Sequence, residues 1–134
     1  MRSTAHRKQS IDEMKELLSE ISSLVDIILV EGPRDVESLT RLGYTGKILT
    51  CAATNVNDYD LMTEISGKYR RVLLLTDFDQ EGLMLNRRFT EILEHEGVKV
   101  EKGFRRMVGR ITAALGVYAI ESLDNVMDVV ERDV

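Results

Sequence analysis

Cysteine, proline and aromatic residues are scarce in this sequence of 134 residues, which has one cysteine, one proline, no tryptophan and three phenylalanines. The lone Cys51 cannot form a disulfide within the chain or build a multi-cysteine zinc site. One proline and nine glycines are too few for a collagen-like or low-complexity chain. No apolar run approaches the roughly 18 residues of a membrane span, and the basic start lacks the apolar core of a secretory signal. We therefore expect a cytoplasmic protein that does not enter a membrane.

The residues that are present are typical of one globular domain, with 43% hydrophobic and 31% charged. The formal net charge of −5 disfavours a surface coated for nonspecific nucleic-acid binding. Cations are nevertheless concentrated in residues 99–110, where Glu101 is the one acid among them. These cations are Lys99, Lys102, Arg105, Arg106 and Arg110. A solvated helix face is the simplest explanation for any single cluster of this kind.

Short apolar runs alternate with segments of helical periodicity, which is the pattern of βαβ units in a parallel sheet. We expect strands at 27–30, 47–51, 71–76 and 98–101. We expect a first helix at 11–24 with Ser10 as its N-cap, and a second from Pro33 to Gly43. A third helix is capped by Asn57 or Asp58 and ends at Gly67, and a fourth ends at Gly97. A C-terminal helix runs through 120–130. The predicted fold class is α/β, with helices flanking a four-stranded parallel sheet.

Three acids directly follow predicted strands: Glu31 after the first, and Asp77 and Asp79 after the third. Ligands of open parallel sheets bind beyond the carboxyl ends of the strands, where the strand order reverses. The two acid sites can share a ligand only if the first and third strands are neighbours, which suggests the strand order 2-1-3-4. Carboxylates this close repel one another unless a cation joins them, and oxygen ligands without cysteine or histidine favour Mg²⁺. A single Asp-x-Asp at a strand end would otherwise be a turn or a helix cap.

The residues around these acids resemble a known family. The segments VEGPRD at 30–35 and LTDFDQEG at 75–82 are similar to the two motifs of the Toprim domain. Those motifs are a glutamate and glycine after strand one, and Asp-x-Asp with a downstream glycine after strand three. Toprim domains occur in topoisomerases, bacterial primases, overcoming-lysogenization-defect nucleases and the 5S ribosomal RNA maturation endonuclease. The resemblance covers about residues 25–101 and implies a Rossmann-like Toprim fold with a Mg²⁺-dependent phosphoryl-transfer centre acting on nucleic acid.

The resemblance also implies roles for individual acids. Glu31 would be the general acid or base, or would contribute to the metal site, and Asp77 and Asp79 would bind Mg²⁺ directly or through water. Glu81 matches a third acid of the topoisomerase motif and could help to hold a second ion. Asp35 matches a position that is commonly acidic in the nuclease-like members, although an acid that favours the helix dipole is an equal alternative. We expect that Mn²⁺ can replace Mg²⁺.

A metal ion beside a phosphodiester polarises it and lowers the pKa of an attacking water. The helix N-termini after Glu31 and Asp77 favour a phosphate at the same place. Arginines can hold the flanking nucleic-acid backbone without reading its sequence. We expect Arg105, Arg106 and Arg110, just after the fourth strand, to bind the substrate in this way.

The expected organisation is one globular unit in three parts: a helical extension at 1–24, a Toprim domain at 25–101, and a basic connector with a C-terminal helix at 102–134. A topoisomerase needs a tyrosine nucleophile on a separate domain, and a primase needs a zinc region and a polymerase body. We expect instead a small stand-alone Toprim nuclease of RNA-processing type. It would be similar to the Toprim nuclease domain of the 5S ribosomal RNA maturation endonuclease and to that of bacterial primases.

Two other hypotheses stay open. One is a noncatalytic, metal-dependent Toprim module that binds nucleic acid or nucleotides. The net charge and the lack of an aromatic stacking surface weaken binding by the chain alone, so such a module would work with a partner protein. The other is a phosphoacceptor receiver-like domain, but receivers carry their acid pair after strand one and a lysine after a fifth strand. RNA or DNA as substrate, one or two metal ions, and a protein partner or a homodimer remain undecided at this point.

Overall fold

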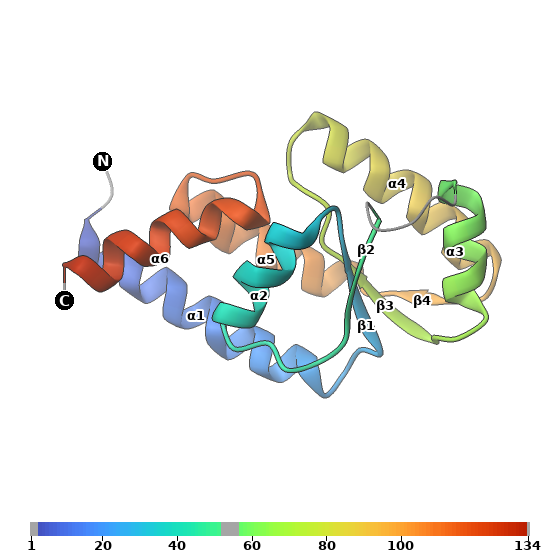
Figure 1. Ribbon diagram of the computed structural model, residues 1–134, viewed down its shortest axis with the longest axis horizontal. Helices are drawn as coiled ribbons and strands as arrows, with labels where there is room; N and C mark the ends of the chain where they lie inside the picture. The colour runs from blue at the N-terminus through green and yellow to red at the C-terminus, as the bar shows by residue number, and fades with distance from the viewer. Residues whose placement is uncertain (1–2, 52–56, 134) are drawn as a thin grey trace.

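Four parallel strands form one sheet in the computed structural model, which describes residues 3–51 and 57–133. The strands are β1 (Ile27–Val30), β2 (Ile48–Thr50), β3 (Arg71–Leu74) and β4 (Lys99–Val100), in the order β2-β1-β3-β4. Ile28 of β1 pairs with Ile48 of β2 on one side and with Leu73 of β3 on the other. The predicted α/β class, the strand order and the adjacency of the first and third strands are therefore confirmed (Figure 1).

Helices cover both faces of the sheet, as Figure 1 shows. They are α1 (Thr4–Ser22), α2 (Pro33–Arg41), α3 (Asp58–Ser66), α4 (Gln80–His95), α5 (Lys102–Leu115), the short 3-10 helix η1 (Ile120–Ser122) and α6 (Leu123–Arg132). Ile28 and Val30 of β1 belong to the hydrophobic core shared with α1, α2, α5 and α6, whereas Ile27 and Leu29 belong to the core shared with α3 and α4. Both faces of the strand are thus buried, which explains why β1 is apolar at every position.

The first helix begins earlier than predicted. It starts at Thr4, because the side chain of Ser3 accepts a hydrogen bond from the backbone N–H of His6 and caps the helix there. The predicted cap, Ser10, is instead a buried residue inside the helix. The apolar periodicity begins only at Ile11, so a hydrophobic pattern cannot reveal the polar turns that precede it.

Residues 102–115, predicted to be a basic connector, form helix α5 instead. Its apolar residues recur at helical spacing and pack into the core that includes α1 and β3; they are Phe104, Val108, Ile111 and Leu115. The basic residues between them obscure this pattern in the sequence. All the cations of the cluster except Lys99 of β4 therefore lie on a packed helix.

The two ends of the described chain lie together, with α6 beside α1 (Figure 1). The hydroxyl of Thr4 donates a 2.9 Å hydrogen bond to Asp133. Arg41, at the end of α2, forms ion pairs of 2.8 and 2.9 Å with Asp128 and Glu131 of α6. These contacts attach the C-terminal helix to the body of the fold. Across residues 3–51 and 57–133, the structure contains no helix with both the length and the apolar character needed to cross a bilayer.

Candidate metal centre

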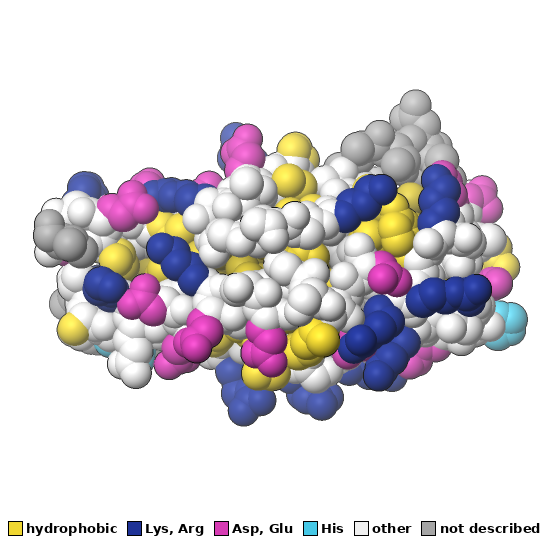
Figure 2. All heavy atoms as spheres, turned by 90° about the horizontal axis from the view of Figure 1, so that it is seen from below, with side chains coloured by type: hydrophobic (Ala, Val, Ile, Leu, Met, Phe, Trp, Pro, Cys, Tyr) yellow, Lys and Arg dark blue, Asp and Glu magenta, His cyan; other side chains and the backbone are white. Residues whose placement is uncertain are grey.

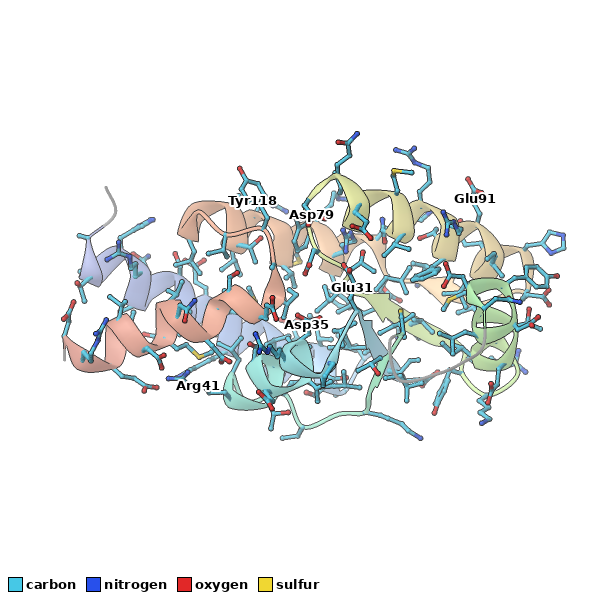
Figure 3. The ribbon with its side chains drawn as sticks, turned by 45° about the horizontal axis from the view of Figure 1, so that its top comes forward. Glu31, Asp35, Arg41, Asp79, Glu91 and Tyr118 are labelled. Atoms are coloured by element: carbon cyan, nitrogen blue, oxygen red, sulfur yellow. The ribbon has the colours of Figure 1, made fainter. Side chains whose placement is uncertain are left out.

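Glu31 and Asp77 are joined directly at the carboxyl edge of the sheet. Oε2 of Glu31 accepts a 2.7 Å hydrogen bond from the backbone N–H of Asp77. Because β1 and β3 are adjacent and parallel, this bond connects the segments that leave the two strands at the same edge. Figure 3 shows Glu31 at this edge, with Asp79 on the side of α4 and Asp35 on the side of α2. The structure thus brings the two predicted acid sites together.

Asp79 is the N-cap of α4. Its Oδ1 accepts a 2.7 Å hydrogen bond from the backbone N–H of Gly82, and the hydroxyl of Thr76 donates to the carbonyl of Gly82 at 2.7 Å. A Cβ atom at position 82 would collide with the backbone of Asp77, so the turn can fold back this closely only with glycine there. The glycine of the second motif therefore sets where Asp77 and Asp79 lie relative to α4.

The carboxylates of the centre lie close enough to change one another's ionisation. Burial, together with the charge of Glu31, raises the pKa of Asp77 to about 6, against a 3.3 Å hydrogen bond that Asp77 Oδ1 accepts from the N–H of Ile120. Burial is also the main cause that raises the pKa of Glu31, with the charge of Asp79 adding to it, while the hydrogen bond from Asp77 lowers it. Mutual repulsion of this kind is what a bound cation relieves.

Asp35 lies in the first turn of α2, where it is buried and both of its carboxylate oxygens accept backbone hydrogen bonds. Oδ2 accepts from the N–H of Gly32 at 3.0 Å, which caps α2, and Oδ1 accepts from the N–H of Glu121 at 3.1 Å, which ties η1 to α2. Burial raises the pKa of Asp35. This acid therefore holds the turn after β1 in place beside Glu31, with both oxygens engaged.

The donor set suits a hard cation, although it is not a ready-made cage. Hydrogen bonds from the described residues use one oxygen each of Glu31, Asp77 and Asp79, which leaves the second oxygen of each for a ligand. In the described part of the chain, no three His, Cys, Asp or Glu side chains are close enough to enclose an ion. Mg²⁺ keeps several waters and needs only one or two direct carboxylates. These three acids therefore fit Mg²⁺ or Mn²⁺ held partly through water.

Glu81 is exposed in the first turn of α4, two positions beyond the capping Asp79. Its negative charge is one of the causes that raise the pKa of Glu31. Glu81 is therefore within electrostatic reach of the centre, at its solvent side. From this position Glu81 could contact a hydrated ion at the centre without contacting the other acids.

Arg105 differs from the other arginines predicted to bind phosphate, because it is only 8% exposed. Its guanidinium donates hydrogen bonds to the carbonyls of Leu74, Thr76 and Asp77 at 3.2, 2.8 and 3.3 Å, and lies 4.4 Å from the centroid of the Phe78 ring. Burial lowers the pKa of Arg105 to about 10, while the nearby carboxylates oppose this shift. The expected phosphate contact does not fit this placement, and we assign Arg105 to holding the segment after β3 beneath the acids.

Arg106 and Arg110 are both exposed on α5. In residues 3–51 and 57–133, neither forms an ion pair, whereas Lys102 of the same helix pairs with Glu94 at 3.0 Å. They are therefore available to an external anion. On the face seen in Figure 2, Lys and Arg side chains are interspersed with Asp and Glu, so that face is not uniformly basic.

Residues 118–121 also border the centre, a placement that no sequence motif indicated. The backbone N–H of Phe78 donates a 2.6 Å hydrogen bond to the carbonyl of Tyr118, and the N–H of Ile120 donates to Asp77. Backbone groups make these contacts, and every residue except proline carries both, so the side chains at these positions contain no signal for them. The segment before α6 is thus part of the framework that positions Asp77.

Comparison with known proteins gives the same assignment as the motifs. The chain matches the sequence model of the Toprim domain over residues 26–102. It is 36% identical over 120 residues to a UPF0292 protein of Methanocaldococcus jannaschii, covering 87% of this chain and 91% of that protein. It is 33% identical over 117 residues to a UPF0292 protein of Methanosarcina barkeri, covering 87% and 80%. A solved structure of a protein from Aquifex aeolicus superposes with a TM-score of 0.62 at 25% identity, covering 86% of this chain and 95% of that chain.

Proposed function

The chain belongs to the UPF0292 family of Toprim domain proteins, and on this premise we propose that it is a Mg²⁺-dependent phosphodiesterase that cleaves nucleic acid. The observation that carries the proposal is the hydrogen bond between Glu31 and Asp77, beside which Asp79 caps α4. It joins the segments that carry Glu31, Asp77 and Asp79 at the carboxyl edge of the sheet, where open α/β folds bind their ligands. The domain itself points to metal-dependent work on nucleic acid, and cleavage is the more specific claim.

Each acid has a part that follows from its placement. Asp77 and Asp79 would hold the ion through the oxygens that the backbone hydrogen bonds leave free. An ion held there would supply polarisation of the phosphodiester and a lower pKa for the attacking water. We assign proton transfer to Glu31, because it approaches from the neighbouring strand and the N–H of Asp77 fixes its orientation. Glu81, exposed in the first turn of α4, is placed to help with a second ion.

The substrate would be held by groups around the acids. The N-terminus of α4 begins at Asp79 and presents its positive end to a phosphate at the centre. Arg106 and Arg110 would bind flanking phosphates, which positions a nucleic acid without reading its sequence. We propose the RNA-processing type of Toprim nuclease, similar to the 5S ribosomal RNA maturation endonuclease. The near-complete coverage of the M. jannaschii relative, 91% of its length, supports a small Toprim protein.

The alternative is a noncatalytic module that binds nucleic acid or nucleotides with a partner protein. The net charge of −5 disfavours strong binding to nucleic acid by the chain alone, which is why a partner would be needed. A protein of this kind would bind its ligand in a metal-dependent manner without turning it over. Binding and cleavage must therefore be measured separately.

The test is to incubate the protein with end-labelled structured RNA, single-stranded DNA and double-stranded DNA, each with Mg²⁺, Mn²⁺ or EDTA. The proposal predicts RNA cleavage with Mg²⁺ or Mn²⁺ and none with EDTA. Asp77→Asn, purified in the same way, controls for a contaminating nuclease and should be inactive or nearly so. Metal-dependent binding without cleavage of any substrate would replace the enzyme with the binding module.

A further inference from the structure

A groove of ≈ 680 Å³ opens between α4 and α5, next to the acids. We propose that it receives one unpaired nucleotide of the nucleic-acid substrate, with the base inside and the adjoining phosphate on the arginines of α5; this inference rests on the proposed function and specifies its substrate. The volume lies in the range of pockets that take small organic ligands, roughly 300–1,000 Å³. The residues that carry the argument are Phe78, Leu83, Asn86, Arg106, Gly109 and Arg110.

The first wall of the groove is the ring of Phe78. Arg105 lies over this ring at 4.4 Å from its centroid, and a Cβ atom at position 109 would come within 2.9 Å of its Cε1. Glycine inside a helix is unfavourable relative to alanine, so Gly109 makes room for the ring at a cost in helix stability. Leu83, 47% exposed on α4, also lines the groove. Nucleobases pack on aromatic and apolar surfaces of this kind without regard to sequence.

The second feature is an acceptor with no partner. Asn86 lines the groove from α4, and its Oδ1 is buried without a hydrogen bond to any described residue. A buried acceptor left unpaired is unfavourable, so such groups usually have a partner. Amino and ring N–H groups of nucleobases are donors of the kind that this oxygen lacks. An apolar ligand of the same size would leave Asn86 unpaired, which is why we favour a base.

The third feature is charge at the rim. Arg106 and Arg110 line the groove, are exposed, and lack an acidic partner in the described ranges. A nucleotide matches this arrangement, since its base is flat and largely apolar and its phosphate is an anion. Phe78 stands in sequence between Asp77 and Asp79, so a base against its ring would place the same strand at the acids. A base in a duplex is stacked on both faces and paired along one edge, so it would have to leave the duplex to enter the groove, whereas an unpaired nucleotide enters without this cost.

The test is binding in EDTA, where no cleavage occurs, measured by fluorescence anisotropy with the full chain. The probes are labelled single-stranded RNA and DNA of about eight nucleotides, and duplexes of the same sequences. We expect the single strands to bind more tightly than the duplexes. Asn86→Leu and Arg106→Gln should each weaken single-strand binding by about three- to tenfold. Arg132→Gln, an exposed arginine at the end of α6, is the matched control and should bind as the wild type does.

A thermal melt separates this role from a structural one. Asn86→Leu removes an unpaired buried acceptor, so its melting temperature should equal or exceed that of the wild type while its binding falls. The proposal is overturned if single strands do not bind, if duplexes bind as tightly as single strands, or if both groove variants bind like the wild type. It is also overturned if sedimentation shows a dimer that Asn86→Leu disrupts, because the groove would then hold a second copy of the chain. Single-strand binding without cleavage in Mg²⁺ would support the nucleotide groove and reject the nuclease function. Cleavage that the groove variants leave unaffected would support the nuclease function and reject the nucleotide groove.

Discussion

The carboxylate of Glu31 accepts a 2.7 Å hydrogen bond from the backbone N–H of Asp77, and this bond links the two Toprim motifs across 46 positions of sequence. It orients the candidate for proton transfer against a candidate metal ligand before any ion binds. The carboxylate of Asp77 accepts a hydrogen bond from the backbone N–H of Ile120 and is repelled by the charge of Glu31. Substitutions in this centre should therefore separate stability, metal binding and turnover.

Asp77 should destabilise the metal-free protein at neutral pH. Its pKa of about 6 in the folded state lies above the ordinary 3.8, so its contribution to stability is full below about pH 4 and is lost as the pH rises through about 6. Asp77→Asn removes the charge and keeps an oxygen that can accept the hydrogen bond from Ile120. In EDTA the free energy of unfolding of the variant should exceed that of the wild type by about 1–2 kcal/mol at pH 7.5 and by almost nothing near pH 4, as measured by urea unfolding at both pH values.

Glu91→Gln is the matched control for this prediction, because Glu91 is exposed on α4 and should change stability little at either pH. A gain for Asp77→Asn of the same size at both pH values would mean that relief of charge repulsion is not its cause. A loss of stability at neutral pH would show that the carboxylate is favourable in the folded state.

Mg²⁺ or Mn²⁺ should stabilise the wild type by mass action, since the ion binds the folded centre. The increase in melting temperature should be smaller for Asp77→Asn and Asp79→Asn, and it should be unchanged for Glu91→Gln. Asparagine also caps helices well, so Asp79→Asn should still start α4 correctly. Isothermal titration with Mn²⁺ gives the direct measurement, and equal affinity in the wild type and both variants would exclude these two acids as ligands.

Arg105 and Arg106, neighbours in sequence, should have opposite effects. Arg105→Ala leaves the carbonyls of Leu74 and Thr76 without their donor and should lower the free energy of unfolding by about 3 kcal/mol. Arg106→Ala should leave stability unchanged, weaken nucleic-acid binding and reduce the slope of log affinity against log salt by about one. Urea unfolding and salt-dependent binding measure the two effects. An Arg105→Ala protein that is as stable as the wild type but has a flatter salt dependence would return Arg105 to the phosphate-binding surface.

Gly82 and Gly103 offer a comparison of the same substitution in two helices. A Cβ at position 82 collides with the backbone of Asp77, which cannot move away as a side chain could, so Gly82→Ala should destabilise the protein by about 3 kcal/mol or more. Position 103 in α5 has no neighbouring atom within 4 Å, so Gly103→Ala should stabilise it by about 0.5 kcal/mol. Thermal unfolding of both variants checks the pair. Equal effects would mean that the turn after β3 is not held as tightly as the structure indicates.

The sheet and the closeness of its acids could be predicted, because the apolar or polar character of successive side chains marks where each strand lies and where it ends. Ile27 to Val30 are apolar throughout, which indicates a strand buried on both faces, and Glu31 marks where it ends. If Glu31 and Asp77 share a ligand, β1 and β3 must be neighbours, and this reasoning gave the observed strand order.

Other parts of the centre depend on contacts that arise only in the folded chain. Arg105 and Arg106 are the same residue type at neighbouring positions, so the sequence does not distinguish them. Arg105 is buried because its guanidinium binds three carbonyls at the end of β3 and just after it. The spacing of Asp35 is compatible with a cap and with a ligand, and Glu121, far along the chain, engages its second oxygen. The support from Ile120 comes through its backbone, so no residue pattern reveals it.

The role of Glu31 in cleavage is tested by comparing Glu31→Gln with the wild type on the same labelled RNA in Mg²⁺, measuring the single-turnover cleavage rate and the binding affinity side by side. Glutamine keeps an oxygen for the N–H of Asp77, and Glu37→Gln, an exposed glutamate on α2, controls for the loss of one charge. We expect Glu31→Gln to cleave at least about 100-fold more slowly and to bind within about twofold of the wild type, with Glu37→Gln like the wild type in both. Cleavage by Glu31→Gln at the wild-type rate would contradict the assignment of this centre.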